Sequence, residues 1–165
     1  MYRILSILVR NHAGVLSHVA GLFTRRGYNI ASIAAGETAD PMITRITIVT
    51  AGDEVMLEQV SKQLSKLIDV IKVEELSYED SVSRELLLLT IFVPKEKRPE
   101  VVMLANTFGV TVADIAKETM TLEFTGNSLK INNIIKVLDN YKIKDLARTG
   151  LLALPLESSI EKKIS

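Results

Sequence analysis

The sequence predicts an α+β fold built from two tandem units, each with the strand and helix order βαββαβ. In the first half, stretches of alternating apolar residues and stretches with helical apolar spacing follow one another in that order. The order returns in the second half, where Gly109 lies 82 positions after Gly27. A polar linker without periodicity, residues 78–84, separates the halves. Each unit is therefore expected to be a ferredoxin-like sheet with two helices on one face.

The first half contains the predicted strands and helices of a first domain at residues 1–77. The strands cover residues 2–10, 30–37, 43–51 and 70–76. A helix over residues 14–26 carries the apolar stripe Val15, Leu16, Val19, Ala20, Leu22 and Phe23. A second helix over residues 53–68 begins with Asp53 and Glu54, which suit the positive end of a helix dipole. Its inner face is predicted to be Val55, Leu57, Val60, Leu64 and Leu67.

The second half repeats these elements in a second domain at residues 85–156. Strands are predicted at residues 85–93, 112–116, 119–125 and 142–154, the last one broken at Gly150. Residues 95–98 lead into a helix that contains Val101 and Leu104, the counterparts of Val19 and Leu22. The final helix, residues 127–141, has the stripe Leu129, Ile131, Ile134, Ile135 and Leu138. A flexible tail is expected at residues 157–165.

The composition narrows the class of protein. Twenty Lys and Arg residues balance twenty Asp and Glu residues, whereas a nucleic-acid partner normally requires a basic excess. The absence of cysteine excludes disulfides, thiolate metal sites and a cysteine nucleophile. The first residues read directly as an amphipathic strand and not as a signal peptide, and no apolar run reaches membrane-spanning length. We therefore expect a cytoplasmic protein that binds neither nucleic acid nor membranes.

The loop Asn11-His12-Ala13-Gly14, between the first strand and the first helix, has two interpretations. It can be an ordinary turn, in which Asn11 or a neighbour caps the helix and Gly14 relieves backbone strain. Alternatively, the amides of Gly14, Val15 and Leu16 hold the carboxylate of a small metabolite, and the Asn11 side chain hydrogen-bonds the same ligand. The local residues leave both interpretations open.

Asn29 and Ile30 form a second candidate region. They follow Gly27, where the first helix is expected to end, so Asn29 can simply belong to the turn after a helix. A sheet with helices on one face leaves its other face and both edges uncovered, and such surfaces usually find a partner. We therefore expect at least a homodimer. The hypothesis is that an edge strand of one copy brings Asn29 and Ile30 to the loop of another.

Catalytic and metal sites find little support in the sequence. The two histidines, His12 and His18, are six positions apart, whereas a helical two-histidine metal site uses a spacing of four with a carboxylate nearby. The acidic pairs at residues 74–75 and 79–80 are typical of solvated strand ends and linkers. No P-loop, G-x-S-x-G or G-x-G-x-x-G pattern occurs. The chain is therefore predicted to be a binding or regulatory protein and not an enzyme.

Several ordered motifs carry a family resemblance over residues 2 to about 154. The first half contains Asn11-x-x-Gly14-Val15-Leu16 and Phe23-x-x-Arg26-Gly27-Tyr28-Asn29-Ile30-x-Ser32. The second half contains Arg84-Glu85-Leu86, Thr125-Gly126-Asn127-Ser128-x-Lys130-Ile131 and Ala147-Arg148-Thr149-Gly150-x-x-Ala153-Leu154. Together they closely resemble the regulatory small subunit of acetohydroxyacid synthase, also called acetolactate synthase. The first half is similar to its ACT domain and the second half to its C-terminal domain.

This resemblance implies a non-catalytic subunit that binds a thiamine-diphosphate-dependent catalytic subunit. Such a subunit raises the activity of its partner and confers feedback inhibition by a branched-chain amino acid, usually valine. The resemblance also implies an effector site between two ACT domains of a dimer. One copy would supply Asn11, His12, Ala13, Gly14, Val15 and Leu16, and the other would supply Asn29 and Ile30. The chain itself is then expected to carry no cofactor and no metal, whereas thiamine diphosphate, magnesium and FAD belong to the catalytic partner.

Two functional classes remain open at this point. The first is the regulatory subunit, and the second is a free-standing amino-acid sensor of the ACT type that acts on another enzyme. The choice among valine, isoleucine and leucine also stays open, because one methylene changes binding by only about 1–3 kcal/mol. The oligomer beyond a dimer and the surface that touches the catalytic subunit are open too.

Overall fold

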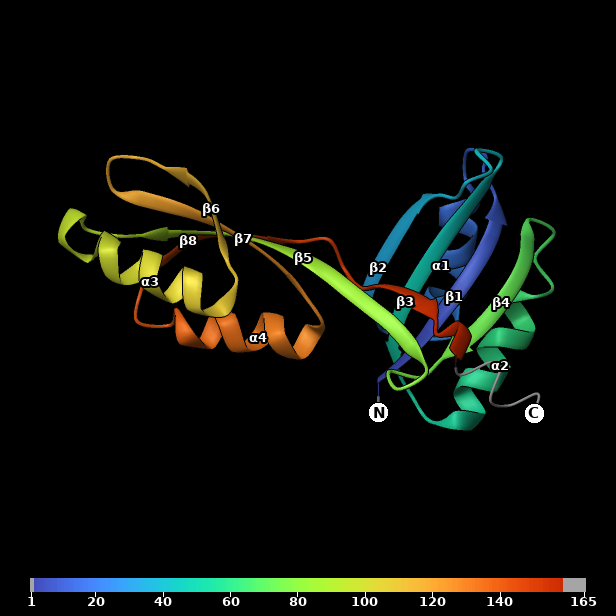
Figure 1. Ribbon diagram of the computed structural model, residues 1–165. Helices are drawn as coiled ribbons and strands as arrows, with labels where there is room; N and C mark the ends of the chain where they lie inside the picture. The colour runs from blue at the N-terminus through green and yellow to red at the C-terminus, as the bar shows by residue number, and fades with distance from the viewer. Residues whose placement is uncertain (1, 159–165) are drawn as a thin grey trace. The chain divides into compact units, whose positions relative to one another are not determined.

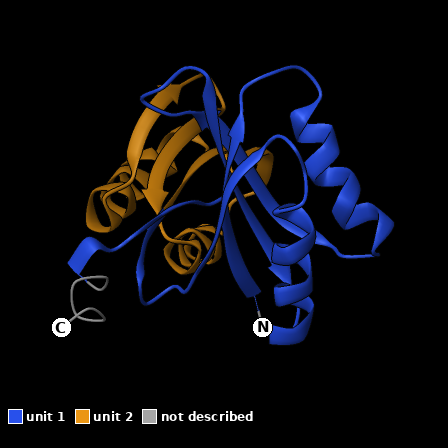
Figure 2. Ribbon diagram, turned by 90° about the vertical axis from the view of Figure 1, so that its right-hand side faces the viewer, with its two compact units in different colours: residues 1–83, 151–165 blue, residues 84–150 orange. Residues whose placement is uncertain are grey.

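The computed structural model describes residues 2–158 and divides the chain into two compact units (Figure 2). Within the described residues, the first unit runs to Ser83 and includes the segment from Leu151 onward. The second unit is formed by residues 84–150. Each unit contains a mainly antiparallel sheet and two α-helices in the predicted order, so the predicted α+β fold is confirmed.

The first unit has a four-stranded sheet in the order β2-β3-β1-β4, in which every neighbouring pair is antiparallel (Figure 1). Its elements are β1 (Tyr2–Arg10), α1 (Val15–Arg25), β2 (Ile30–Glu37), β3 (Ile43–Ala51), α2 (Glu54–Leu64) and β4 (Val70–Leu76). The four strands have the predicted bounds. Helix α2 is shorter than predicted, because the amides of Lys66 and Leu67 bond three residues back and form turns in place of a further helical turn.

The core of the first unit lies between one face of this sheet and the two helices. Alternate residues of β1 and β3 point to that face and are fully buried, as the period of a strand requires. The cluster consists of Leu5, Ile7, Val9, Val15, Val19, Leu22, Phe23, Ile46, Ile48, Leu57, Val60 and Leu64. The sheet is therefore held to α1 and α2 by a continuous apolar layer.

Three residues predicted to lie on inner helix faces are exposed. Leu16, Val55 and Leu129 are each the second residue of a helix and have 44%, 63% and 69% of their surface exposed. Val55 and Leu129 lie two positions before a buried residue, which is about 200° around the helix. Leu16 directly follows the buried Val15 and is rotated by about 100°. The prediction placed these three apolar residues on the inner faces of their helices, but their angular positions put them on the exposed side.

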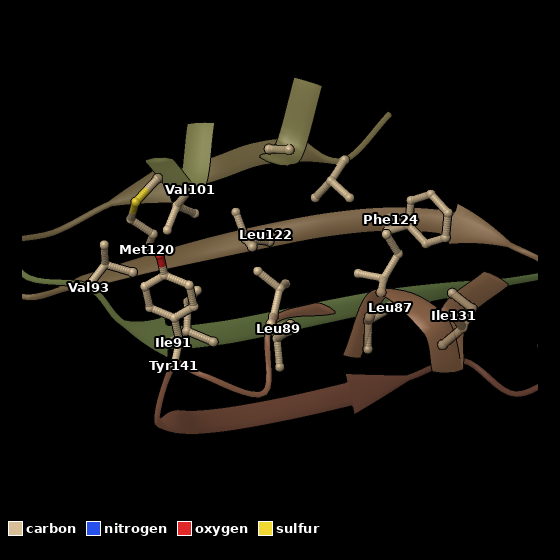
Figure 3. Close-up of a cluster of buried hydrophobic side chains, with 14 residues drawn as sticks. Leu87, Leu89, Ile91, Val93, Val101, Met120, Leu122, Phe124, Ile131 and Tyr141 are labelled. Carbon is tan, nitrogen blue, oxygen red and sulfur yellow. The ribbon is translucent and has the colours of Figure 1, made fainter. Parts of the chain in front are cut away.

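The second unit has a sheet in the order β6-β7-β5-β8. Its elements are β5 (Ser81–Phe92), which begins in the first unit, the short 3₁₀ helix η1 (Lys95–Lys97), α3 (Arg98–Phe108), β6 (Thr111–Ile115), β7 (Thr119–Gly126), α4 (Ser128–Val137) and β8 (Ile143–Arg148). Figure 3 shows its core, in which Leu87, Leu89 and Ile91 of β5 face Leu122 and Phe124 of β7. This layer repeats the packing of the first unit.

The domain boundaries differ from the prediction at both ends of the second domain. Residues 81–84, predicted to be linker, belong to β5. The predicted last strand forms two separate strands, β8 and β9 (Leu152–Pro155), on either side of Gly150, which has φ = 82°. Leu151 and Ala153 are buried in the first unit. They make a small cluster there with Ile4, Val49 and Leu76, so β9 covers part of the sheet face that the helices leave open.

Two hydrogen bonds donated by backbone amides also attach residues 151–156 to the first unit. The Leu156 amide donates to the Asp80 carbonyl at 2.8 Å. The Leu151 amide donates to the Ser32 hydroxyl at 2.9 Å. Most of the predicted tail, residues 159–165, lies outside the described residues. The predicted second domain therefore extends too far, because the apolar residues after Gly150 find their buried surface in the first unit.

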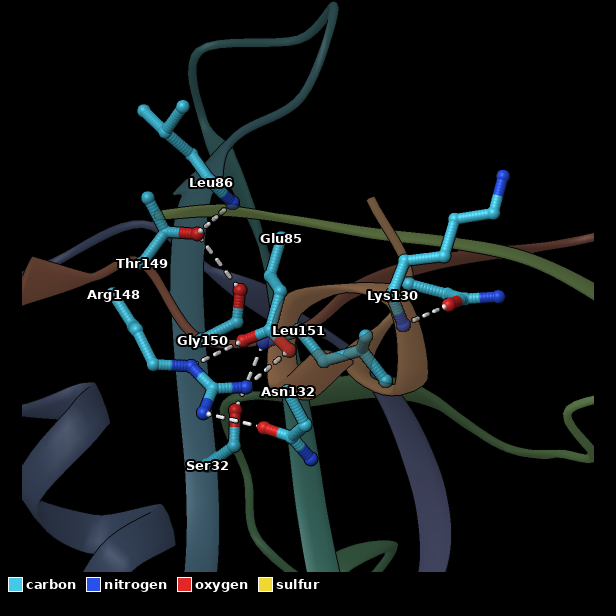
Figure 4. A network of polar contacts seen from close by, with 10 residues as sticks. Ser32, Glu85, Leu86, Lys130, Asn132, Arg148, Thr149, Gly150 and Leu151 are labelled. Atoms are coloured by element: carbon cyan, nitrogen blue, oxygen red, sulfur yellow. Dashed lines mark hydrogen bonds and ion pairs between the residues drawn. The ribbon is translucent and has the colours of Figure 1, made fainter. Parts of the chain in front are cut away.

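A buried ion pair explains two of the family motifs in the second unit. The Glu85 side chain is 4% exposed and accepts two hydrogen bonds from Arg148, from Nη2 at 2.6 Å and from Nε at 3.1 Å (Figure 4). Arg148 Nη1 also donates to Asn132 Oδ1 at 3.2 Å. The pair joins β5 to β8 and the arginine reaches α4, so these residues hold the unit together and contribute no open site.

None of the helices in the described part of the chain combines the length and apolar character needed to span a bilayer.

Candidate functional site

The start of α1 is left without a cap. Gly14 occupies the N-cap position with φ = 90° and ψ = −15°, a left-handed conformation that favours glycine. Among the residues that the structure describes, no side chain accepts a hydrogen bond from the first turn of α1, and that turn contains no acidic residue. The side-chain cap expected from Asn11 or a neighbour is therefore not formed, whereas Gly14 has the left-handed conformation that the ordinary-turn interpretation expected, and the Val15 amide donates to the His12 carbonyl at 3.4 Å. The first-turn amides form a positive end that favours an anion.

The Asn11 side chain points to the turn between β2 and β3. Its Nδ2 donates to the Pro41 carbonyl at 2.9 Å and to Glu37 Oε1 at 3.2 Å. The backbone amide of Asn11 donates to the Met42 carbonyl at 2.7 Å. Among the described residues, none donates to Asn11 Oδ1. The loop is thus fixed to the β2–β3 turn while one side-chain acceptor stays open.

His12 is held by a residue that the sequence did not single out. Its Nε2 lies 2.7 Å from Asp69 Oδ1, and its Nδ1 lies 2.9 Å from the Ala13 carbonyl oxygen. The hydrogen bond to Asp69, with a smaller effect of the Ala13 carbonyl, raises the pKa of His12 above its usual value of 6.5. The same hydrogen bond lowers the pKa of the Asp69 carboxyl. Asp69 is 57 positions away from His12 in the chain, so no local pattern could have indicated this contact.

Asn29 and Ile30 lie at the opposite end of the sheet from the loop. Ile30 pairs with Thr50, which in turn pairs with Arg3 near the start of β1, whereas the loop follows Arg10 at the end of β1. Arg10 lies seven residue steps along the extended strand from Arg3, a distance of about 23 Å. One copy of the chain therefore keeps the two predicted halves of the site apart.

Strand β2 is an edge of this sheet and is largely open to solvent. Five of its eight residues are exposed and the other three are half-buried, and Ile33 is 37% exposed. An edge strand presents unpaired backbone groups to a further strand. This edge begins beside Asn29 and ends at Glu37, which contacts Asn11.

Possible metal sites and cavities were compared with the position of the loop. Within residues 2–158, no group of three or more histidine, aspartate or glutamate side chains is arranged to hold a metal ion. One cavity of about 590 Å³ lies between α1 and α2, where Arg26, Lys62 and Lys66 line it. Another of about 420 Å³ lies in the second unit beside Phe124 and Lys130. Neither of these two cavities is lined by the loop residues 11–14, of which His12, Ala13 and Gly14 are exposed.

Two family models together match most of the chain. Residues 5–72 match the ACT domain that is like that of the acetohydroxyacid synthase small subunit. Residues 84–157 match the small subunit of acetolactate synthase. The two matches meet close to the point where the first unit gives way to the second.

Curated relatives and a crystal structure agree with these models. The chain is 47% identical over 152 residues to the probable acetolactate synthase small subunit of Methanothermobacter thermautotrophicus, covering 92% of this chain and 90% of the relative. It is 41% identical to the acetolactate synthase small subunit of Aquifex aeolicus, covering 97% and 84%. The small-subunit crystal structure from Thermotoga maritima superposes with a TM-score of 0.87 at 35% identity, covering 94% of this chain and 97% of that one. The chain therefore belongs to the acetolactate synthase small-subunit family.

Proposed function

We propose that this chain regulates the catalytic subunit of acetolactate synthase by binding a branched-chain amino acid at the start of α1. In this proposal the chain raises the activity of its partner and makes it sensitive to feedback inhibition, with valine as the effector. The catalytic partner supplies thiamine diphosphate, magnesium and FAD, and the chain itself performs no chemistry. The complex would act in the cytoplasm.

The uncapped turn supports binding of the effector's carboxylate. Among residues 2–158, no side chain accepts from the first-turn amides of α1, and the space where a Cβ at Gly14 would stand is open. Asn11 Oδ1 can accept from the α-ammonium group, because it is an acceptor next to the same turn. The charged ends of an amino acid thus find complementary groups of both kinds.

The apolar part of the effector needs a second surface. Leu16 is 44% exposed on the first turn of α1 and offers one apolar wall. Burying an isopropyl group contributes about 1.5–3 kcal/mol, so a second wall has a clear energetic value. Ile30 of a second copy is the residue that we assign to this wall.

We propose a dimer because the loop and the pair Asn29 and Ile30 lie at opposite ends of the sheet within one copy. If two β2 strands pair antiparallel about Ile33 and Ala34, Ile30 of the second copy lies opposite Glu37 of the first. Glu37 contacts Asn11, so Asn29 and Ile30 of the second copy arrive beside the loop. The site is then complete only across two copies. Effector binding favours one arrangement of the dimer, and a difference of about 1–3 kcal/mol is enough for regulation.

The first experiment tests regulation directly. The purified chain is mixed with its cognate catalytic subunit, and the rate of acetolactate formation is followed with and without valine. We expect the rate to rise on mixing and to fall again with valine. A rate that stays unchanged on mixing would contradict the regulatory role and favour a sensor that acts on another enzyme.

The second experiment tests the shared site. Asn11→Ala and Asn29→Ala are each expected to abolish valine binding in calorimetry. When the two variants are unfolded together and refolded, each mixed dimer contains one site with both asparagines intact. We expect valine binding to return at about one site in four. If both asparagines acted in the same copy, mixing would restore nothing.

A further inference from the structure

A carboxylate that the proposed function does not use lies next to the loop. Asp69, in the turn before β4, is 14% exposed at its side chain. Its Oδ1 lies 2.7 Å from His12 Nε2, and its Oδ2 lies 3.6 Å from His18 Nδ1 on α1. Its carbonyl oxygen accepts from the Arg10 amide at 2.9 Å. One residue thus contacts the end of β1, the loop and the first helix.

Both ring nitrogens of His12 face atoms that can only accept hydrogen bonds. Nε2 faces a carboxylate oxygen, and Nδ1 faces the carbonyl oxygen of Ala13. A neutral imidazole has one N–H donor and one acceptor nitrogen, so it can satisfy only one of these contacts. The imidazolium has two donors and satisfies both. The geometry therefore favours a protonated His12.

The contact with Ala13 links this proton to the proposed site. Ala13 directly precedes Gly14, so a hydrogen bond to its carbonyl fixes the peptide plane that carries the Gly14 amide. Loss of the proton leaves either the Ala13 carbonyl or the Asp69 carboxylate without its donor. The loop then loses one of the two hydrogen bonds made by the His12 ring.

We propose that His12 and Asp69 are positioning residues for the effector loop, and that the proton they share makes effector binding depend on pH. This inference rests on the proposed function, because it assumes that the amides after Ala13 contact the effector. The charged groups around His12 are Arg10 on β1, His18 on α1, Asp69 before β4, and Glu37 of β2, which reaches the loop through Asn11.

The direction of the effect follows from the ionised pair. Asp69 stays ionised throughout the neutral range, because its hydrogen bond from His12 lowers the pKa of the carboxyl. The pKa of His12 is raised by the same contact, so the loop is fixed below that pKa and released as the pH rises through it. Valine binding is therefore strongest at the acidic end of this range. Because the His12 side chain is 46% exposed, the expected change is modest, about two- to fivefold.

The first test needs no effector. The chain contains two histidines, so NMR titration of the full chain gives two imidazole signals, and His18→Gln identifies the one that belongs to His12. We expect His12 to titrate above 6.5, and the backbone amide signals of Gly14 and Leu16 to shift with the same midpoint. In Asp69→Asn the midpoint of His12 should fall. A wild-type His12 that titrates at or below the ordinary value, or amides that ignore its titration, would overturn the inference.

The second test measures valine affinity by calorimetry at pH 5.5 and pH 8.5, both below the pKa of the amino group of free valine. We expect two- to fivefold weaker binding at pH 8.5 in the wild-type chain and in His18→Gln, the matched control. In His12→Gln and Asp69→Asn the two affinities should be equal. If His12→Gln keeps the wild-type pH dependence, the assignment is wrong. If the wild-type chain binds no valine at either pH, the proposed function fails, and the amide titration still decides whether His12 and Asp69 position the loop.

Discussion

The two units have the same fold but connect their first strand to their first helix in different ways. In the first unit, α1 begins after a left-handed glycine, and its first turn has no side-chain cap. In the second unit, η1 precedes α3, the Lys97 amide bonds to the Pro94 carbonyl, and Pro99 stands in the first turn of the helix. Proline has no backbone N–H, so the first turn of α3 presents fewer free donors than the first turn of α1.

The Arg98 side chain makes a further contact at the start of α3. Its Nη2 donates to the Ala116 carbonyl at 2.6 Å and to the Lys117 carbonyl at 2.7 Å, so the start of α3 is tied to the β6–β7 turn by a side chain. The corresponding tie in the first unit is made by Asn11, which keeps one acceptor open. A repeated fold therefore does not repeat the local environment of a helix start: local backbone conformation and a few polar side chains decide which unit keeps free donors and acceptors there.

The largest expected effect tests whether the two cores are equivalent. Leu57 of α2 and Ile131 of α4 are fully buried and each begins the buried stripe of its helix. We expect Leu57→Ala and Ile131→Ala each to lower the free energy of unfolding of their own unit by about 2–5 kcal/mol. Urea unfolding followed by amide signals from each unit measures this. Leu129→Ala, two residues from Ile131 but exposed, should leave stability unchanged.

The next effect concerns the buried ion pair of the second unit. In Arg148→Ala the Glu85 carboxylate keeps its buried position without its two donors. We expect the second unit to lose about 2–4 kcal/mol, somewhat less than the roughly 3–5 kcal/mol typical of a broken, fully buried pair, because water reaches the Arg148 side. The exposed Lys62–Glu58 pair of the first unit is the control, and Lys62→Ala should produce no measurable change. Equal effects of the two substitutions would show that burial does not distinguish the pairs.

A substitution at Gly14 tests which unit carries the site. Gly14→Asp adds a negative charge beside the proposed carboxylate position, so we expect valine binding to weaken at least about tenfold while activation of the catalytic subunit is kept. Gly109→Asp is the matched control. Gly109 also has a positive φ, 68°, and open space around a Cβ, but it lies at the end of α3 in the second unit. Calorimetry should give wild-type affinity for the control, and unchanged binding in Gly14→Asp would contradict the proposal.

The smallest effect compares the capped helices. Asp53 accepts from the Met56 amide at 2.8 Å at the start of α2, and Asn127 accepts from the Lys130 amide at 2.9 Å at the start of α4. Replacing either by alanine should cost about 1 kcal/mol, measured by thermal unfolding. The two caps occupy corresponding places in the two units, so their costs should agree. A clearly larger cost at one cap would mean that it does more than satisfy a helix end.

The sequence predicted most of the fold because strand and helix periods are local properties. The four strands of the first unit have the predicted bounds, and Asp53 caps α2 where the acidic residues indicated a helix start. The misplacements of Leu16, Val55 and Leu129 arose because apolar character does not give the rotation of a residue around its helix. The segment after Gly150 was assigned to the wrong unit because strand character does not reveal which core the side chains of a strand will pack against.

The candidate site divides in the same way. Local sequence alone singled out the loop from Asn11 to Gly14, because a polar turn that ends in glycine before an apolar stripe is a property of adjacent residues. Only the tertiary structure decided that Asp69 holds His12, that Glu37 and Pro41 hold Asn11, and that Asn29 and Ile30 stand at the far end of the sheet. Contacts between residues far apart in the chain depend on strand order and register, and these are fixed only when the sheet packs on its helices.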